Sequence, residues 1–250
     1  MKEQLARVAR LISQAESTLA LTGAGISIDS GIPAFRGSQG LWERFDPMEY
    51  ASIEAFRRDP AKVWTMLREL DALVMEARPN PAHQALARLE ELGRLTAVIT
   101  QNIDGLHQAA GNRTVIEFHG SGRRLRCLDC GRRWRREEFS LREIPPRCDC
   151  GGLIKPEVVF FGEPIPERAL LAALGLAGAC RVMLVVGTSA VVAPASHLPV
   201  MAKRAGAVVV EINPEPTPLS GEIADYSFTA GGSELLPALV AEVERLLERA

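Results

Sequence analysis

Short runs of β-branched and apolar residues alternate with helical segments along most of this chain. The runs cover residues 18–22, 96–100, 114–118, 181–186 and 207–212. Helices are expected at 2–16, 80–92, 167–179 and 197–205, and the last helix carries on one face Leu235, Leu236, Leu239, Val240, Val243, Leu246 and Leu247. Strands that are apolar on both faces and separated by helices predict an α/β fold with a doubly wound parallel sheet.

Two segments interrupt this alternation. Residues 40–79 show no strand pattern and are expected to be helical, whereas residues 120–156 are rich in cysteine and arginine and offer few core residues. Both are expected to be insertions that form a smaller lobe. The larger domain would then consist of residues 1–39, 80–119 and 157–250.

The composition excludes several classes of protein. A chain of 250 residues with 47% hydrophobic residues is not disordered, and a net charge of −2 does not suit the binding of a polyanion. Residues 182–202 are apolar and long enough to span a bilayer, but Gly187, Pro194 and Pro199 interrupt them. They are expected to contain a buried strand, so we expect no membrane association and a location in the cytoplasm.

Four of the five cysteines lie close together in the sequence, as the pairs Cys127-x-x-Cys130 and Cys148-x-Cys150. Four thiolates are the ligand set of a closed tetrahedral zinc site, which leaves no open position for catalysis. The sequence therefore predicts one structural zinc ion, and the alternative is a group of unconnected buried thiols. The fifth cysteine, Cys180, is expected to lie in the core.

A glycine-rich turn follows the first predicted strand directly. Gly23 and Gly25 would let backbone amides approach a phosphate closely, and a helix beginning beyond them would favour negative charge. Tight packing is the alternative reason for these glycines. Ile28 takes the place of the third glycine of the dinucleotide fingerprint, so a generic hydride-transfer enzyme is a poor fit.

Further motifs follow this turn in a fixed order. They are GAGIS at 23–27, SGIPAFRG at 30–37, TQNIDGLH at 100–107, FHGS at 118–121, the cysteine pairs, VFFGE at 159–163, GTS at 187–189 and INP at 212–214. This series resembles the sirtuin family of NAD-dependent protein lysine deacylases over essentially the whole chain. The resemblance implies a Rossmann-like domain with a smaller inserted lobe, and a cleft between them where NAD meets an acyl-lysine peptide.

The resemblance also implies which residues carry the chemistry. His119 matches the catalytic base, and an imidazole can take a proton from a ribose hydroxyl near neutral pH. Asn102 would help to hold the ribose and a water, and Asp104 would accept from the nicotinamide carboxamide. The products would be free lysine, nicotinamide and O-acyl-ADP-ribose. His83 and His107 lie outside the base position and are expected to be structural.

The remaining implied contacts belong to the cofactor and the substrate. The NAD-binding residues, besides Asn102 and Asp104, would be Gly23, Ala24, Gly25, Ser27, Phe35, Arg36, Gln101, Ile103, Gly187, Thr188, Ser189, Asn213 and Gly232. Phe35 would shield the reactive face from water. The substrate peptide would add as a strand between two edges, represented by Val159, Phe161, Gly162, Glu163 and Val192.

The acyl specificity depends on two leucines. The C-terminal half resembles a family branch that includes desuccinylases, which hold an acyl carboxylate with a Tyr-x-x-Arg pair upstream of Pro-Asn. The matching positions here are Leu67 and Leu70. Burying a carboxylate without a cation is costly, so we expect uncharged acyl groups, acetyl or longer aliphatic ones. Arg68 lies one residue from the matching position. A shift of the register by one residue would place a cation there and would favour charged acyl groups.

Alternative functions share the same residues. A protein mono-ADP-ribosyltransferase or a desuccinylase-type deacylase would use His119, Asn102 and Asp104 as well, and a non-enzymatic NAD-sensing module would not need them. The expected partner is a protein that carries acyl-lysine. The arginines around the cysteines are expected to form a solvated face, so nucleic-acid binding is not expected.

Overall fold

A six-stranded parallel sheet forms the centre of the larger part of the molecule. The computed structural model describes residues 1–36 and 40–249, so Gly37 at the end of the SGIPAFRG motif lies outside it. The strands are β1 (Thr18–Thr22), β2 (Ala97–Thr100), β3 (Val115–Glu117), β7 (Val182–Val186), β8 (Val208–Asn213) and β9 (Tyr226–Thr229). Their order is β3-β2-β1-β7-β8-β9, and all neighbours pair in parallel. The predicted doubly wound sheet is confirmed.

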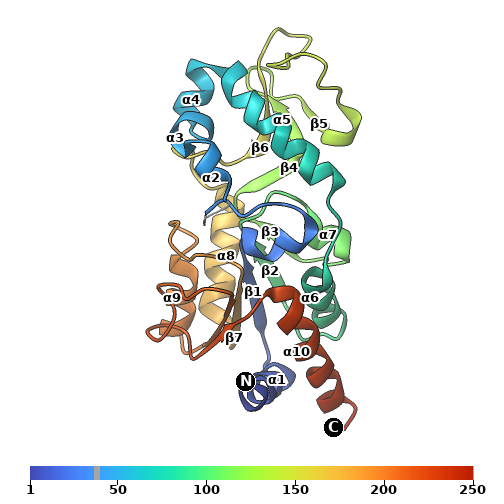
Figure 1. Cartoon of the computed structure of the whole chain (residues 1–250), viewed down its shortest axis with the longest axis vertical. Coiled ribbons are helices and arrows are strands. Elements are labelled where there is room, and N and C mark those ends of the chain that lie inside the picture. Colours follow the sequence, from blue (N-terminus) through green and yellow to red (C-terminus); the bar gives the residue numbers. More distant parts are fainter. Residues whose placement is uncertain (37–39, 250) are drawn as a thin grey trace.

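Helices cover both faces of this sheet. α1 (Lys2–Gln14), α6 (Pro81–Glu91) and α10 (Gly232–Leu247) pack on one face, and α8 (Glu167–Ala179) and α9 (His197–Arg204) pack on the other (Figure 1). Successive strand residues point to opposite faces, so Ala20 of β1 joins the first core whereas Leu19 and Leu21 join the second. α7 (Leu106–Ala110) lies between β2 and β3 in the chain.

The sequence missed one strand of the large sheet. All five expected runs are strands, with ends that differ from the expectation by at most one residue. β9, however, forms the edge next to β8. Only Phe228 of its four residues is buried, because an edge strand covers little core. So short a segment with a single buried residue has no recognisable strand pattern.

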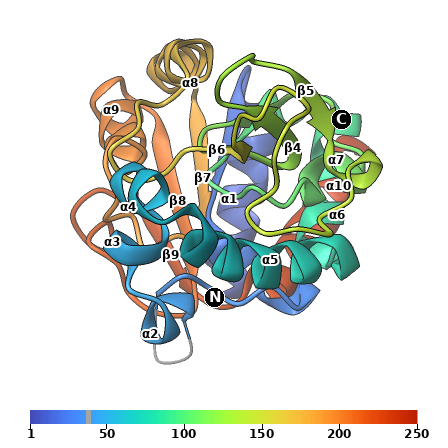
Figure 2. The ribbon, with the colours of Figure 1, turned by 90° about the horizontal axis from the view of Figure 1, so that it is seen from above.

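The second lobe combines short helices with a small antiparallel sheet. The helices are α2 (Leu41–Arg44), α3 (Pro47–Tyr50), α4 (Ile53–Arg58) and α5 (Pro60–Glu76), and the strands are β4 (Gly120–Cys127), β5 (Arg133–Arg135) and β6 (Ile154–Val158), in the order β5-β4-β6. Figure 2 shows the helices on one side of this lobe and the strands on the other. They share a core, in which the Trp64 indole donates to the Ile154 carbonyl at 3.0 Å.

Residues 120–156 contribute few residues to the buried core, as expected. Leu125, Cys127, Cys148 and Ile154 are buried in the core shared with the helices. A segment with isolated apolar residues can contribute to a core when another segment supplies the remaining surface, which here is the face of α5 with Trp64.

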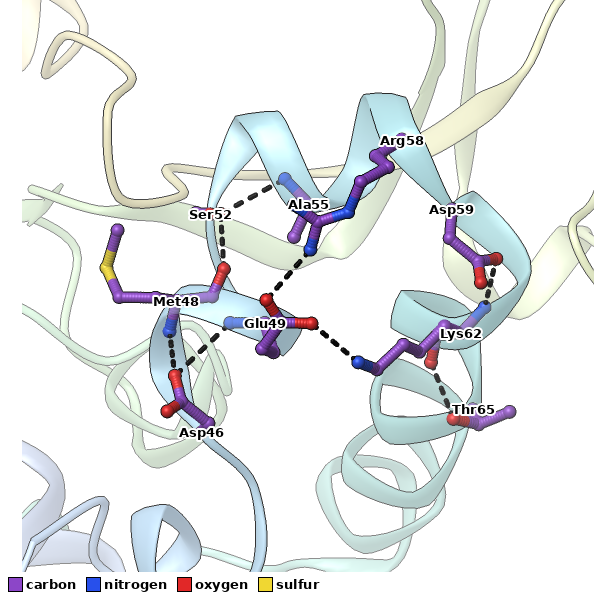
Figure 3. Close-up of polar contacts among 9 residues, drawn as sticks. All are labelled: Asp46, Met48, Glu49, Ser52, Ala55, Arg58, Asp59, Lys62 and Thr65. Atoms are coloured by element: carbon purple, nitrogen blue, oxygen red, sulfur yellow. Dashed lines mark hydrogen bonds and ion pairs between the residues drawn. The ribbon is translucent and has the colours of Figure 1, made fainter.

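The helical segment 40–79 is divided into pieces by side-chain caps. Three residues accept hydrogen bonds from the amides that begin α3, α4 and α5, namely Asp46, Ser52 and Asp59 (Figure 3). Glu49 then binds both Arg58 and Lys62, at 2.9 and 2.7 Å. Caps of this kind satisfy amides that have no partner inside the helix, and so fix where each helix begins.

None of the helices within residues 1–36 and 40–249 combines the length and the apolar composition that crossing a membrane requires. The apolar stretch 182–202 contains β7 and part of α9, as expected of a buried strand.

Candidate active site and metal centre

The glycine turn after β1 packs against the turn after β7. The Gly25 amide donates to the Gly187 carbonyl at 2.8 Å, and a Cβ atom on Gly25 would lie 2.8 Å from the Gly187 Cα. Residues Ala24–Ser30 form a 3-10 helix instead of the α-helix that the turn suggests. The close packing of two backbones therefore requires Gly25, in addition to any approach of a phosphate.

The predicted cofactor residues gather at the carboxyl edge of the large sheet. The turn after β1 carries Gly23, Ala24, Gly25 and Ser27, the one after β2 carries Gln101, Asn102, Ile103 and Asp104, and the one after β7 carries Gly187, Thr188 and Ser189. Asn213 ends β8. Since β1 lies between β2 and β7, these turns flank the point where the strand order reverses, the usual ligand crevice of such sheets.

Three other predicted contacts lie on separate segments. Gly232 begins α10, and a Cβ atom there would come within 3.1 Å of the Val186 side chain beneath the crevice. Phe35 is half-buried and stacks on Trp42 with ring centroids 5.1 Å apart, whereas Arg36 is exposed.

The Ser27 hydroxyl links Asp104 and Asn102, the carboxylate and the amide side chain that are predicted to act in catalysis. This hydroxyl donates to Asp104 Oδ2 at 2.8 Å and accepts from Asn102 Nδ2 at 3.1 Å. Asn102 Nδ2 also donates to the Gly23 carbonyl at 3.1 Å. All three side chains are buried. The structure thus joins the turns after β1 and β2 into one hydrogen-bonded network.

His119 lies between β3 and β4, and among the described residues only one of its ring nitrogens has a hydrogen-bond partner. Its Nδ1 lies 3.1 Å from the carbonyl oxygen of Gln101. A carbonyl only accepts, so Nδ1 carries the proton and Nε2 carries the lone pair. Burial lowers the pKa of His119 below its usual 6.5, which keeps the ring neutral near pH 7. This arrangement leaves a neutral imidazole in one tautomer, with Nε2 able to accept a proton.

Two further histidines lie beneath the network. His83 and His107 are fully buried with ring centroids 4.9 Å apart. Burial lowers the pKa of His83 to about 4 and that of His107 to about 3, so both are neutral. His83 Nε2 lies 3.5 Å from the Ser27 hydroxyl, and His107 Nε2 lies 2.9 Å from that of Thr22. The sequence contains no signal for these contacts.

The predicted substrate edge is partly paired already. The Phe161 amide donates to the Ala51 carbonyl at 2.8 Å, and its carbonyl accepts from the Ile53 amide at 3.0 Å. Gly162, the next residue, is exposed. On the other predicted edge Val192 is half-buried, and its carbonyl accepts from the Ser196 amide at 2.9 Å.

Leu67 and Leu70 both line a small cavity of about 30 Å³ under α5. The other lining residues are Trp64, Asp71, Val74, Ile103, Gly122, Leu125, Pro156 and Val158. Arg68 points to solvent and does not line it, so the shifted register does not occur. The one charged residue among these lining residues is Asp71, whose two oxygens each accept from Arg136 at 2.6 Å.

The four paired cysteines converge despite the short second spacing. The Sγ atoms of Cys127, Cys130, Cys148 and Cys150 all lie within 4.8 Å of one another. Two of the separations are 3.6 and 3.7 Å, too long for a disulfide bond of about 2.05 Å. Tetrahedral ligands about 2.3 Å from zinc lie about 3.8 Å apart. The donors therefore fit a structural zinc ion.

Glycines make room for the short spacing. Gly151 has a φ of +88°, and a Cβ atom on Gly152 would lie 2.6 Å from the Cys127 sulfur. The arginines around the site are largely neutralised by acidic neighbours, as in the pairs Arg124–Glu117, Arg132–Asp149 and Arg135–Glu137. This pairing agrees with a solvated face.

Comparisons with known proteins give a consistent picture. The sequence model of the Sir2 family matches residues 23–194. The NAD-dependent protein deacylase 2 of Pyrobaculum aerophilum is 51% identical, over 96% of each chain. A mutant Sir2 homologue solved with ADP-ribose has a TM-score of 0.94 and 44% identity over 98% of each chain. A Sir2 protein solved with a myristoylated histone peptide has a TM-score of 0.84 and 40% identity over 100% of each chain.

Proposed function

The chain belongs to the Sir2, or sirtuin, family, and from this premise we propose that it is an NAD-dependent protein lysine deacylase that removes uncharged acyl groups. Acyl-lysine, NAD and water would give free lysine, nicotinamide and O-acyl-ADP-ribose. The deacylase name of the relative and the ADP-ribose and acyl-peptide complexes of the solved neighbours support this reaction.

The observation that carries the proposal is the state of His119. With Nδ1 donating to the Gln101 carbonyl and the ring kept neutral by burial, Nε2 is the atom that would take the proton of a ribose hydroxyl. NAD, when bound, supplies the ribose carbon from which nicotinamide leaves. His119 acts on the hydroxyl of that ribose, so its tautomer has to be fixed before the substrate arrives.

The network around Ser27 would orient the nicotinamide end of NAD. Asp104 Oδ2 accepts from Ser27 and Oδ1 accepts from the Leu106 amide at 2.9 Å, so the carboxylate is held in place while lone pairs remain for a carboxamide N–H. Asn102 keeps its Oδ1 available for a hydroxyl or a water, since its Nδ2 supplies the contacts to the turn after β1.

The preference for uncharged acyl groups follows from the cavity under α5. Leu67 and Leu70 offer no hydrogen bond to an acyl carboxylate, and the one charged lining residue, Asp71, is an acceptor that is paired with Arg136. A succinyl carboxylate would be desolvated there without a cation of its own among the lining residues, because Arg136 is already paired with Asp71, and this disfavours the ionised form. Acetyl and longer aliphatic chains need no such partner and meet a lining that is mostly apolar.

The two lobes would have different roles in binding. Residues 1–39, 80–119 and 157–250 would bind NAD, whereas 40–79 and the zinc module 120–156 would form the small lobe that completes the cleft. Zinc held by the four thiolates would be structural. The cytoplasmic location, the absence of membrane association and the absence of nucleic-acid binding stay predictions.

Product analysis tests the proposal. The protein is incubated with NAD labelled in its adenine ring and an acetyl-lysine peptide, and the label is followed by mass spectrometry. Label in O-acetyl-ADP-ribose, with stoichiometric nicotinamide and free lysine, is the expected result. Label attached to protein without loss of acetyl groups would instead identify a mono-ADP-ribosyltransferase.

A further inference from the structure

Lys155 is a buried cation at the end of the zinc module. It lies on β6 and is 4% exposed. Its ammonium donates to the Val158 carbonyl at 2.6 Å and to the Pro156 carbonyl at 3.3 Å, and it pairs with Glu163 at 2.9 Å. The charge also lies 4.2 Å from the centroid of the Phe160 ring. Three donors are thus matched by three oxygens, as a buried ammonium requires.

These contacts all fall on residues 156–163, which include the substrate edge expected from the resemblance at residues 159–163. Lys155 reaches residues 156, 158 and 160 from one side. The alternate residues are held from the other side, because the Val159 amide donates to the His119 carbonyl at 2.8 Å and Phe161 pairs with Ala51 and Ile53. The segment is therefore fixed on both sides.

The hydrogen bonds that hold this segment do not include the backbone of Gly162. Within the described part of the chain, neither its amide nor its carbonyl takes part in a backbone hydrogen bond. The turn around it is closed by Glu163, whose amide donates to the Phe160 carbonyl at 2.9 Å and whose carboxylate accepts from the Phe160 amide at 2.8 Å. The carboxylate that closes the turn is the same one that Lys155 binds.

We propose that Lys155 is a positioning residue for the acyl-lysine peptide: it fixes the backbone from Val158 to Glu163 so that the free peptide groups of Gly162 face the incoming strand. The inference rests on the proposed function, because it assumes that a peptide adds at this edge. Lys155 itself touches no substrate, since it is enclosed by the segment that it organises.

The positioning depends on the charge and its donors. A methionine at position 155 has similar length but cannot donate to the carbonyls of Pro156 and Val158. It would also leave the Glu163 carboxylate without its cation in a site where that side chain is 22% exposed. The turn at Gly162 would then no longer be held in one arrangement.

Lys62 offers a control in the same lobe. It pairs with a glutamate, Glu49, at 2.7 Å (Figure 3). Its ammonium also lies 4.8 Å from the centroid of the Tyr50 ring. It has the same combination of ion pair and aromatic ring as Lys155, but its contacts lie on α3 and not on residues 156–163. Lys62→Met therefore reports the loss of a more exposed ion pair, with the Lys62 side chain 36% exposed and that of Lys155 5% exposed, that makes no contact with residues 156–163.

The experiment measures KM for an acetyl-lysine peptide and for NAD separately, in the wild type, Lys155→Met and Lys62→Met. We expect the peptide KM of Lys155→Met to rise at least tenfold, which corresponds to about 1.4 kcal/mol. KM for NAD should change less than twofold, and Lys62→Met should leave both values within twofold of the wild type. A parallel rise in both KM values, or an equal peptide effect in Lys62→Met, would overturn the inference.

Two additions keep the outcome clear. If Lys155→Met is unfolded by circular dichroism, Glu163→Gln replaces it. That variant keeps an acceptor for the Phe160 amide but loses the charge, and it should raise the peptide KM at least threefold without changing the KM for NAD.

If the wild type turns over no peptide, the proposed function fails. Binding of a fluorescent acetyl-lysine peptide, measured by anisotropy, then tests Lys155 alone, and equal affinity in both proteins would contradict its role.

Discussion

The backbones of Gly25 and Gly187 touch, and neither position has room for a side chain. Gly25 donates its amide proton to the Gly187 carbonyl, and a Cβ atom on Gly187 would lie 2.3 Å from the Ile26 nitrogen. Gly187 also has a φ of +60°, a conformation that L side chains rarely adopt. The contact joins the turns that follow β1 and β7, and so shapes the floor of the crevice in which NAD is proposed to bind.

Gly25→Ala is therefore expected to destabilise the protein by about 1–3 kcal/mol, the usual cost of overpacking a tight contact. It should also weaken ADP-ribose binding, because the two turns must separate. Thermal unfolding and calorimetric titration measure the two effects. Gly178→Ala on α8 is the control, since a Cβ atom added there would meet nothing within 4 Å and no loss of stability or affinity is expected. Unchanged ADP-ribose affinity in Gly25→Ala would contradict this account.

The pH dependence of catalysis should report His119. Because burial lowers the pKa of this imidazole below 6.5, the neutral base persists as the pH falls through 6.5, and kcat/KM should decline only at lower pH. The measurement is a pH profile of kcat/KM for the peptide at saturating NAD. An acidic limb with its midpoint above pH 6.5 would be inconsistent with a buried neutral histidine as the base.

The buried histidines should make stability depend on pH. His107 has a folded pKa of about 3 and an unfolded value near 6.5, so the unfolded chain binds more protons between these values. Its contribution to stability is complete above pH 6.5 and is lost as the pH falls, by about 1.4 kcal/mol per unit. Denaturant unfolding of the wild type and His107→Gln at pH 7 and pH 5 compares the two slopes. The variant should lose about 2 kcal/mol less between these pH values, and identical slopes would exclude the effect.

The acyl preference should respond to the positions of Leu67 and Leu70. Introducing Leu67→Tyr together with Leu70→Arg places a hydroxyl and a cation in the lining of the cavity under α5. The ratio of kcat/KM for succinyl-lysine to that for acetyl-lysine should rise at least tenfold, because the carboxylate gains a partner. Asp71→Asn removes a negative charge and releases Arg136 from its ion pair, and its effect should be smaller because Arg136 does not line the cavity. A ratio that stays unchanged in the double variant would place the acyl group elsewhere.

The metal centre predicts one zinc ion per chain, measured by elemental analysis of the purified protein. Cys148→Ser should abolish zinc retention and lower the Tm, because the ion links two segments of the small lobe. Cys180→Ala is the control. Cys180 is buried in the core under α8, outside the cluster, and its replacement should leave the zinc content at one. Zinc that stays bound in Cys148→Ser would refute the four-thiolate site.

The large sheet could be predicted because each strand carries its own signal. A run such as VMLVV at 182–186 is apolar on both faces, and only a strand covered by helices on both sides buries it. The small sheet has no such signal. β5 consists of Arg133, Trp134 and Arg135, and its place is decided by pairing with β4 and not by its own composition.

The site was predictable as a set of residues but not as a network. The motifs name Ser27 and Asp104, yet 77 positions separate them, and only the fold brings the hydroxyl to the carboxylate. Lys155, in contrast, is a residue that no motif in the sequence singles out. A single lysine gives no indication that it will be buried, because its burial depends on carbonyls and a carboxylate that meet only after the chain has turned at Gly162.

The central claim is that His119 serves an NAD-dependent removal of uncharged acyl groups. The most direct measurement follows NAD and matched acetyl-, butyryl- and succinyl-lysine peptides by mass spectrometry, with the wild type and His119→Ala. The account predicts that the wild type removes the acetyl and butyryl groups, forms the corresponding O-acyl-ADP-ribose and leaves the succinyl peptide largely intact, whereas His119→Ala is inactive. Turnover of the succinyl peptide as fast as the acetyl peptide, or full activity of His119→Ala, would contradict it.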